Sequence, residues 1–437
     1  MRRPQARGEA GRRLNPAITG IGLITPIGND YASVERSLRG GIHGLEPVRF
    51  LGNPALPVKV AGTVKGFSVD SPSWRDWSWP AEYEIPREVL RGMAPHGVYA
   101  VCAVLQALAH AGLRPADVAD DPRTGLYCAS AGSPMLLHFN IAKMRAARGA
   151  RGNPLGVVSS IAGTLNFNLA AHFRITGGVC GFVSACASSS HALGYAIDDI
   201  RLGRLDRIIV VGAEEMNADS LLPFAHMRAL SGQSDPRRAS RPFDAARDGF
   251  VGAGGAVALV LEGSRAAAGR GARALAQAEG WGQAADGYSV AASHPGGVGL
   301  RLAMERALAD AGVDAGAIDH VSAHATSTTV GDSAEAAALG QVFTARGLRP
   351  RVSATKALTG HALSVSGAMQ AALAVVSMSG GFVPGNPHLE NPCPESEGLD
   401  LPRGAVEGAP AMVLSNSSGF GGSNVCHVLA APAPITC

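Results

Sequence analysis

The sequence predicts an α/β protein built from two similar halves, and three observations support this fold class. Short apolar runs typical of buried strands alternate with alanine-rich segments of helical period along the 437 residues. The segment 107–118 (ALAHAGLRPADV) is echoed at 307–318 (ALADAGVDAGAI), and each copy leads into a β-type run. The segment 186–193 (CASSSHAL) is echoed at 356–363 (KALTGHAL). Two echoes in the same order favour a duplicated architecture over chance similarity.

The individual elements follow from the same periodicities. Apolar strands are expected at 17–25, 125–131, 207–215, 256–263, 320–326 and 411–418. Helices are expected at 99–112, 187–203, 299–312, 332–343 and 364–379. Fully apolar strands between helices imply a sheet that is covered on both faces. We place the halves at 17–270 and 271–437, with 263–274 (GSRAAAGRGARA) as the join.

Composition excludes several classes of protein. A chain that is 46% hydrophobic and 17% charged is typical of a compact globular protein. A net charge of +3 without a basic block argues against nucleic-acid binding, and no apolar run reaches 18 residues, which argues against a membrane span. Seven cysteines without a C-x-x-C pair indicate a reducing cytoplasm. Residues 1–16 are rich in arginine, lack the apolar stretch of a secretory signal, and are expected to form a disordered tail.

Cys186 is a candidate nucleophile at the point where a strand-like run gives way to a helix. The N-terminus of a helix offers free N–H groups and a positive dipole end, so we expect the thiol pKa to fall below about 8.5. Small neighbours leave room for an acyl group. The alternative is a buried structural thiol, which is the interpretation we give to Cys102, Cys128 and Cys426. On local features alone the two interpretations of Cys186 are balanced.

The segment 324–336 (HATSTTVGDSAEA) groups several polar side chains after a predicted strand. His324 ends the strand, Thr326 and Thr328 supply hydroxyl groups in the following turn, and Glu335 falls in the next helix. Strand-to-helix junctions of this kind are where open α/β sheets place their ligands.

A second histidine and a lysine stand in the segment 354–367 (ATKALTGHALSVSG), where Lys356 and His361 are five residues apart. Only four of the 38 basic residues are lysine, which suggests that a compact, titratable ammonium is needed at Lys356. The sequence contains no H-E-x-x-H motif and no Cys/His cluster at ligand spacing, so metal binding is not expected. The segment 415–424 (SNSSGFGGSN) is a glycine-rich turn between two strand-like runs.

Together these motifs resemble the β-ketoacyl-[acyl-carrier-protein] synthases, the elongating condensing enzymes of fatty acid and polyketide pathways. The resemblance covers nearly the whole chain after residue 16 and rests on ITGIGLITPIGN, SACASSSHAL, SRPFDAARDGFV, HATSTTVGD, TKALTGHAL and NSSGFGGSN, in that order. It implies a thiolase-like fold of two α/β halves related by a pseudo-twofold axis, in five α/β/α/β/α layers. It also implies an acyl carrier protein as partner, a dimer with itself or with a related subunit, and neither metal nor cofactor.

The resemblance also implies roles for individual residues. Cys186 would take an acyl group from a carrier-protein thioester. His324 and His361 would assist the decarboxylation of a malonyl-type extender and stabilise the enolate, while Lys356 and Glu335 set the charge around them. The backbone N–H groups of Cys186 and Phe420 would form the oxyanion hole, with Phe420 as a gate. The remaining substrate-binding residues would be Thr326, Thr328, Ser418 and Gly421.

Four positions depart from the usual family pattern. Ala325 replaces a glycine, Gly254 replaces a glutamate, Ser418 replaces an aromatic residue, and Ser364 replaces a glycine. Because two of these changes enlarge or polarise the acyl or extender pocket, we expect a specialised natural-product enzyme that handles a functionalised acyl chain.

Other functions fit the motifs less well. A thiolase would need a second catalytic cysteine in a C-x-G turn, but Cys426 is followed by His427 and Val428. A priming condensing enzyme would have asparagine in place of His361. A chain-length partner subunit typically lacks the cysteine at 186. The strongest alternative is a cyclase or release enzyme that forms a C–C bond within the tethered chain and uses no malonyl extender.

Overall fold

A mixed sheet of ten strands forms the centre of the computed structural model, which describes residues 15–48, 56 and 58–432. The expected tail at 1–16 lies, up to residue 14, outside the described residues. The strands cross the sheet in the order β10-β9-β13-β14-β8-β1-β7-β6-β4-β5. Their bounds are β1 (Ala17–Ile24), β4 (Thr124–Ala129), β5 (Val179–Phe182), β6 (Arg207–Glu214), β7 (Gly255–Glu262), β8 (Ala276–Ala285), β9 (His320–Ser322), β10 (Arg351–Ser353), β13 (Met412–Gly419) and β14 (Ser423–Ala430). Two small sheets pair β2 (Leu45–Pro47) with β3 (Val60–Gly62) and β11 (Phe382–Val383) with β12 (Val406–Glu407).

The two ends of the large sheet repeat one pattern of strand directions. From β1 outward, β7 and β6 each run antiparallel to the preceding strand, whereas β4 and β5 run parallel to theirs. From β8 outward, β14, β13, β9 and β10 repeat these directions. The two five-stranded halves meet where β1 pairs antiparallel with β8. This is the duplicated α/β architecture predicted from the sequence, while the boundary between residues 270 and 271 stays a prediction.

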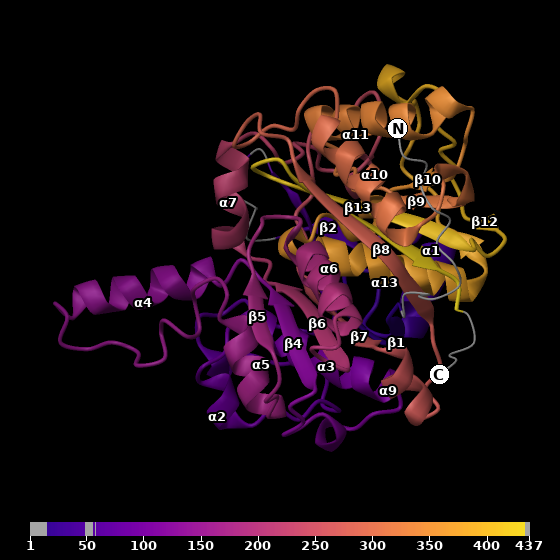
Figure 1. Ribbon diagram of the computed structural model, residues 1–437. Coiled ribbons are helices and arrows are strands. Elements are labelled where there is room, and N and C mark those ends of the chain that lie inside the picture. The colour runs from indigo at the N-terminus through magenta and orange to yellow at the C-terminus, as the bar shows by residue number, and fades with distance from the viewer. Residues whose placement is uncertain (1–14, 49–55, 57, 433–437) are drawn as a thin grey trace.

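Helices lie in three layers around the two half-sheets (Figure 1). One core packs α3 and α5 against strands of the first half, and another packs α10 and α11 against strands of the second half. A third core encloses α6 and α13 between strands of both halves. The helix α4 projects from the body at the left of Figure 1. The helices are α1 (Tyr31–Gly40), α2 (Arg87–Leu90), α3 (Pro95–His110), α4 (Pro134–Ala146), α5 (Leu165–Phe173), α6 (Ser188–Arg201), α7 (Ala218–His226), α8 (Pro236–Ala239), α9 (Ser264–Gly269), α10 (Val298–Ala311), α11 (Thr329–Val342), α12 (Lys356–Thr359) and α13 (Ser366–Gly380).

Glycines explain how closely each outer helix approaches its half-sheet. A Cβ atom at Gly22 of β1 would lie 1.8 Å from the carbonyl oxygen of Ala103 in α3. A Cβ atom at Gly282 of β8 would lie 2.4 Å from the carbonyl oxygen of Ala303 in α10. Any side chain at these glycines would separate helix from strand. The repeated segments that revealed the duplication begin in these same two helices.

The expected strands and helices are present, with boundaries shifted by a few residues, but β8 and β10 of the large sheet were not predicted. The strand β8 (AQAEGWGQAA) is rich in alanine, glycine and glutamine, which are not typical strand formers. Its conformation depends on its pairing with β14 and β1. The predicted join contains α9.

One helical segment, Leu363–Gly380, reaches the length and hydropathy of a membrane span, which the sequence was not expected to contain. However, 89% of this segment is buried inside the protein. It includes α13, whose apolar side chains belong to the core between the two half-sheets. We therefore interpret it as a core helix.

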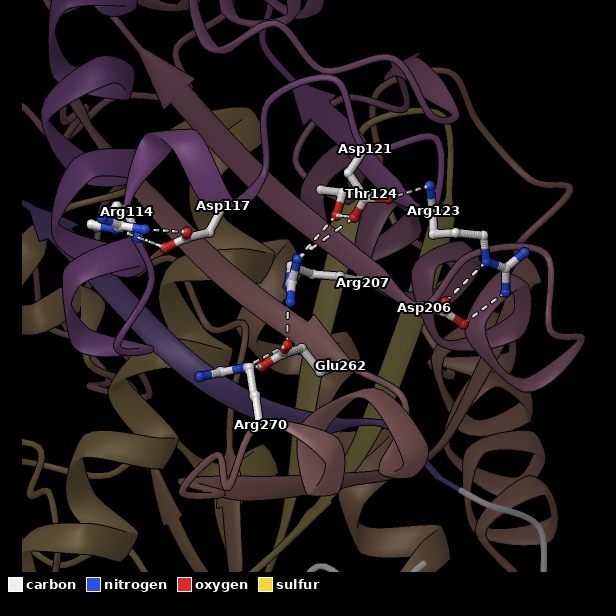
Figure 2. A network of polar contacts seen from close by, with 9 residues as sticks. All are labelled: Arg114, Asp117, Asp121, Arg123, Thr124, Asp206, Arg207, Glu262 and Arg270. Atoms are coloured by element: carbon white, nitrogen blue, oxygen red, sulfur yellow. Dashed lines mark hydrogen bonds and ion pairs between the residues drawn. The ribbon is translucent and has the colours of Figure 1, made fainter.

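An ionic network holds the end of the first half-sheet that lies opposite the motifs (Figure 2). Glu262, fully buried at the end of β7, accepts hydrogen bonds from Arg207 Nε at 3.0 Å and from Thr19 Oγ1 at 2.6 Å. It also pairs with Arg270. A single carboxylate thereby joins β1, β6 and β7 to the chain that follows α9.

Candidate active site

The predicted chemical groups meet at the carboxyl ends of the parallel strands. Cys186 follows β5 and stands two residues before α6. His324 follows β9, and His361 follows β10 and the short helix α12. The structure thus brings together three side chains that are up to 175 positions apart.

The contact between Cys186 and His361 defines the site. His361 Nε2 lies 3.0 Å from Cys186 Sγ. The ring of His324 stands edge-on to that of His361, with 5.3 Å between centroids and an interplanar angle of 88°. All three side chains are buried. His191, which the sequence echo pairs with His361, instead bonds Ser184 and Gln283 outside the site.

A strained turn presents Cys186, the candidate nucleophile. Ala185 adopts a left-handed conformation with φ of 51°, a value that non-glycine residues seldom adopt. The hydroxyl of Ser188 accepts a hydrogen bond from the Ser184 N–H at 2.8 Å and donates one to the Ala185 carbonyl at 2.6 Å. These two bonds hold the turn in the conformation that places Cys186 against His361.

The expected lowering of the Cys186 pKa is wrong. The pKa of this thiol is raised to about 11, mainly by burial and to a smaller extent by the nearby Glu214. The charge of Lys356 and the backbone N–H groups of Phe420 and Cys186 oppose the rise without cancelling it. The sequence analysis counted the N-terminus of the helix but had no measure of desolvation, which is the larger effect here. At neutral pH the group is therefore a thiol that needs a base.

The two histidines are neutral. Burial lowers the pKa of each well below 6.5, and the ammonium of Lys356 lowers both further. Ser366 Oγ lies 3.0 Å from His361 Nδ1 and fixes the orientation of that ring. When Nδ1–H donates to this hydroxyl, Nε2 is free to accept the thiol proton. Sequence reasoning missed Ser366, which carries no signal beyond its place at the start of α13.

Glu335 anchors the backbone around His324. Its carboxylate accepts hydrogen bonds from the N–H groups of His324 at 2.9 Å and Ala325 at 2.6 Å, and from Asn416 Nδ2 at 3.0 Å. Burial nevertheless raises its pKa above the ordinary value.

Lys356 lies behind the histidines and bonds a residue that the sequence analysis did not identify. Its Nζ donates to Gln370 Oε1 at 2.7 Å. Within the described part of the chain, no direct ion pair joins it to Glu335, although the resemblance implied that the two act as a pair. Burial lowers the pKa of Lys356 to about 8, and Glu335 opposes the lowering from a distance. A lone glutamine in the apolar segment GAMQAALAVV was the available signal for this contact.

The glycine-rich turn between β13 and β14 packs against the turn that carries Cys186. A Cβ atom at Gly419 would lie 2.7 Å from the Ser184 carbonyl oxygen, so the approach requires glycine. Phe420 follows, 38% exposed, with its ring 6.1 Å from that of Phe224. This places Phe420 where its backbone reaches Cys186 and its side chain reaches solvent.

A cavity of about 280 Å³ opens onto Cys186. Of the predicted site residues, its lining includes Cys186, His324, Thr326, Thr328, Glu335, His361, Ser418 and Phe420. Lys356 and Gly421 are not part of the lining. Gly421 is exposed, and its N–H donates to the Val290 carbonyl at 3.0 Å.

Ser418 belongs to a polar wall of this cavity. Its hydroxyl donates to Asn424 Oδ1 at 2.7 Å, and Asn424 Nδ2 donates to Asp286 Oδ1 at 2.9 Å. All three residues line the cavity.

The other departures from the family pattern have different surroundings. Ala325 is buried and lines the cavity. Gly254 and Ser364 do not line it: a Cβ atom at Gly254 would lie 2.9 Å from Met216 Cβ, and Ser364 donates to Glu214. Of the four departures from the family pattern, only those at Ala325 and Ser418 therefore change the lining of the cavity.

Comparisons with known proteins agree with this arrangement. The family model "Beta-ketoacyl synthase, N-terminal domain" matches residues 15–267, and "Beta-ketoacyl synthase, C-terminal domain" matches residues 275–390. The 3-oxoacyl-[acyl-carrier-protein] synthase 1 of Escherichia coli (strain K12) is 36% identical over 416 residues, which cover 94% of this chain and 98% of that protein.

Solved structures of similar proteins match the fold of this protein over almost the whole chain. A β-ketoacyl synthase from Burkholderia phymatum STM815 matches with a TM-score of 0.86 at 29% identity, covering 96% of this chain and all of that one (100%). The ishigamide ketosynthase/chain length factor matches with a TM-score of 0.84 at 28% identity, with coverage of 96% and 100%. These matches confirm the predicted thiolase-like fold.

Proposed function

This chain belongs to the β-ketoacyl synthase family of acyltransferases, and from that membership we propose that it joins an acyl group on Cys186 to a malonyl-type extender by decarboxylative condensation. The observation that carries the proposal is the 3.0 Å contact between Cys186 Sγ and His361 Nε2, beside a second neutral imidazole at His324. This pairing supplies a nucleophile, its base and two hydrogen-bond donors in one cavity.

In the first step the Cys186 thiol gives its proton to His361 Nε2, and the sulfur attacks the thioester carbonyl of an acyl-carrier protein. The oxyanion that forms faces the N–H groups of Cys186 and Phe420. The C–S bond to the carrier then breaks, and the departing carrier thiolate takes the proton from His361. The acyl group is now a thioester of Cys186, and His361 is neutral again.

In the second step a malonyl-type thioester replaces the first carrier. Hydrogen bonds from His324 and His361 polarise its thioester carbonyl, the bond to the free carboxylate breaks, and carbon dioxide leaves an enolate. The enolate carbon attacks the acyl carbonyl on Cys186, and the cysteine departs as a thiolate that takes a proton from water. His361 must accept in the first step and donate in the second. Ser366 supports both tautomers because a hydroxyl group donates and accepts.

The substrate we propose is a functionalised acyl chain of a natural-product pathway, carried by an acyl carrier protein in the cytoplasm. The support for a polar substrate is the wall formed by Ser418, Asn424 and Asp286, at a position where the family pattern has an aromatic residue. Thr326 and Thr328, whose hydroxyl oxygens are 3.1 Å apart, offer a second polar contact to a tethered substrate.

The test is intact mass spectrometry of the wild-type enzyme and Cys186→Ala with a panel of acyl thioesters. We expect the wild type to gain the mass of the acyl group and the variant to gain none. Absence of an adduct with every thioester would refute the assignment of Cys186 as the nucleophile. Preference for unbranched fatty acyl groups over all polar ones would refute the specialised substrate.

Measurement of carbon dioxide separates condensation from the alternative reaction. The acylated enzyme should release one equivalent of carbon dioxide per 3-ketoacyl product when malonyl-carrier protein is added. A new C–C bond formed without carbon dioxide would instead show a cyclase or release enzyme that acts within the tethered chain.

A further inference from the structure

One wall of the cavity carries a chain of hydrogen bonds whose direction is fixed. The carboxylate of Asp286 only accepts, and Asn424 Nδ2 donates to its Oδ1 at 2.9 Å. The same amide nitrogen donates to the Gly422 carbonyl at 3.1 Å, which leaves Asn424 Oδ1 as an acceptor. The Ser418 hydroxyl uses its single proton to donate to that oxygen at 2.7 Å.

The open end of this chain is an acceptor. Ser418 is half-buried and lines the cavity, so its oxygen can still accept a hydrogen bond from a bound molecule. Rotation of the hydroxyl toward a ligand would leave Asn424 Oδ1 without this donor, which is unfavourable because Asn424 is only 2% exposed. The wall therefore favours a ligand group that donates, such as a hydroxyl or an amine.

The strand β13 turns Ser418 away from the nucleophile. Its neighbour Ser417 accepts a hydrogen bond from the Ser190 hydroxyl of α6 at 2.7 Å, so that side chain points into the layer of α6 and α13. Gly419 is on the same face, where a Cβ atom would lie 3.2 Å from the Cys186 backbone nitrogen. Side chains alternate along a strand, so Ser418 points to the opposite, outer face.

The outer face of β13 is covered by α10 and α11. Asn416, two residues before Ser418 and on the same face, donates from its Nδ2 to Glu335 of α11 at 3.0 Å. The helix α10 packs against both β13 and α11. Leu300 of α10 and Ala334 of α11 line the cavity together with Ser418. We call the part of the cavity lined by Ser418, Leu300 and Ala334 the outer recess.

We propose that the outer recess holds a hydrogen-bond-donating substituent, a hydroxyl or an amine, on the malonyl-type extender, and that Ser418 selects it. This inference rests on the proposed condensation reaction and names its second substrate. The acyl group on Cys186 begins on the opposite face of β13, so the molecule that reaches Ser418 is the second thioester. That thioester is the one activated by His324, whose backbone N–H is held from the outer side by Glu335.

The substituent takes no part in the bond changes. The bond between the α-carbon of the extender and its free carboxylate breaks, and carbon dioxide leaves. The α-carbon of the enolate then forms the new C–C bond to the acyl carbonyl on Cys186. A hydroxyl or amine on that carbon stays in the 3-ketoacyl product, so the extender is a source of the functional groups in the proposed chain.

The experiment compares malonyl, α-methylmalonyl and α-hydroxymalonyl groups loaded on the same carrier protein. The methyl and hydroxyl substituents are similar in size, but only the hydroxyl donates a hydrogen bond. The measurement is kcat/KM for carbon dioxide release by enzyme already acylated at Cys186. In the wild type we expect hydroxymalonyl to exceed methylmalonyl by about tenfold, the effect of one hydrogen bond to a neutral acceptor.

Ser418→Ala removes the acceptor and keeps the space. The ratio of kcat/KM for hydroxymalonyl to that for methylmalonyl should therefore fall by about tenfold in this variant. Because the ratio compares two extenders in one enzyme, a general loss of activity or stability cancels from it. The matched control is Ser417→Ala on the same strand, which alters the inner face and lies outside the cavity lining. It should keep the wild-type ratio.

Equal use of hydroxymalonyl and methylmalonyl by the wild type would overturn the proposal. A uniform loss with all the extenders in Ser418→Ala would also overturn it, because it would assign the Ser418 contact to the pantetheine arm that they share. Either result leaves carbon dioxide release from malonyl-carrier protein intact in the wild type. An acylated wild type that releases no carbon dioxide from any extender would instead refute the proposed condensation, and this inference with it.

Discussion

At the scale of single residues, the proposed reaction requires a base beside Cys186, because the pKa of this thiol is not low. Burial raises the pKa of the thiol to about 11, so the thiolate is a very small fraction at neutral pH. The pKa of His361 lies well below 6.5, and its Nε2 is 3.0 Å away as a neutral acceptor. Proton transfer and attack on the substrate are therefore expected to occur together, with the charge stabilised only when the substrate is bound.

This arrangement predicts a pH dependence for the alkylation of Cys186 by iodoacetamide. Because the thiol pKa lies far above neutrality, the rate should rise about tenfold per pH unit between about 6.5 and 8.5, in parallel with the thiolate fraction. Peptide mass spectrometry distinguishes Cys186 from the exposed Cys180. A rate that is already constant above pH 7 would show a low pKa and contradict the prediction.

Removal of the base gives a second prediction at this scale. In His361→Ala the thiol loses its proton acceptor, so acyl transfer to Cys186 should slow by about 10² or more at pH 7. Rapid-quench mass spectrometry measures this rate. Transfer at the wild-type rate would show that another group takes the proton.

At the scale of elements, the link between β5 and α6 determines where the nucleophile points. Ala185 has φ of 51°, and the Ser188 hydroxyl holds both sides of the turn. A non-glycine residue in this conformation costs about 1–3 kcal/mol, and the neighbouring hydrogen bonds maintain it. Strain at this turn is the local cost of placing Cys186 against His361.

Substitution of Ala185 tests the role of this turn. Ala185→Val places a β-branched side chain at positive φ and should reduce the free energy of unfolding by about 1–3 kcal/mol, with slower acylation. Ala185→Gly, which accepts the same φ, should change stability by less than about 1 kcal/mol. Denaturant unfolding and acylation rates measure both effects. Equal behaviour of the two variants would show that the conformation imposes no constraint.

At the scale of the whole molecule, different contacts stabilise the two ends of the strands. At the carboxyl ends of the parallel strands, Lys356 and Glu335 are buried with hydrogen-bond partners but, in the described part of the chain, without a direct ion pair between them, whereas the opposite end carries the Glu262 network of Figure 2. Burial raises the pKa of Glu262, but Arg270, Thr19 and Arg207 outweigh it, and the resulting pKa is below the ordinary value.

Glu262→Gln should lower the free energy of unfolding by about 3 kcal/mol at pH 7, because it leaves two arginines without their buried partner. A carboxylate with a lowered pKa contributes stability above its unfolded pKa of about 4.3, and this is lost as pH falls through the folded value. The difference between wild type and variant should therefore shrink below about pH 4. Asp206→Asn in the exposed pair with Arg123 is the control and should have a much smaller effect. A difference independent of pH would contradict the ionic explanation.

The free edge of the sheet predicts a homodimer. The strand β5 ends the ten-stranded order and is largely exposed, with Val179 38% exposed. An exposed edge strand is a template for pairing with another strand. Analytical ultracentrifugation should give twice the chain mass of 44.6 kDa for the wild type and a monomer for Val179→Lys. Ile42→Lys, at an exposed residue away from β5, should stay dimeric. A monomeric wild type would contradict this prediction.

The sequence by itself determined the features that depend on local pattern. Alternation of apolar runs and alanine-rich segments predicted the strands and helices, and the echo between 107–118 and 307–318 revealed the duplication. The order of the motifs identified Cys186, His324 and His361 as candidate catalytic residues, because each stands near a junction between a predicted strand and a helix. These features are encoded over a few neighbouring residues, which is the range over which sequence patterns act.

Only the tertiary structure decided the properties that depend on burial and on distant contacts. It reversed the direction of the Cys186 pKa shift, because desolvation is a property of the whole enclosure. It gave Lys356 a glutamine on another helix as its partner, although the resemblance implied Glu335. It placed Gly421 outside the cavity and Ser418 inside. Which groups lose water, and which side chains meet, follows from packing between separate segments of the chain, and no local pattern contains it.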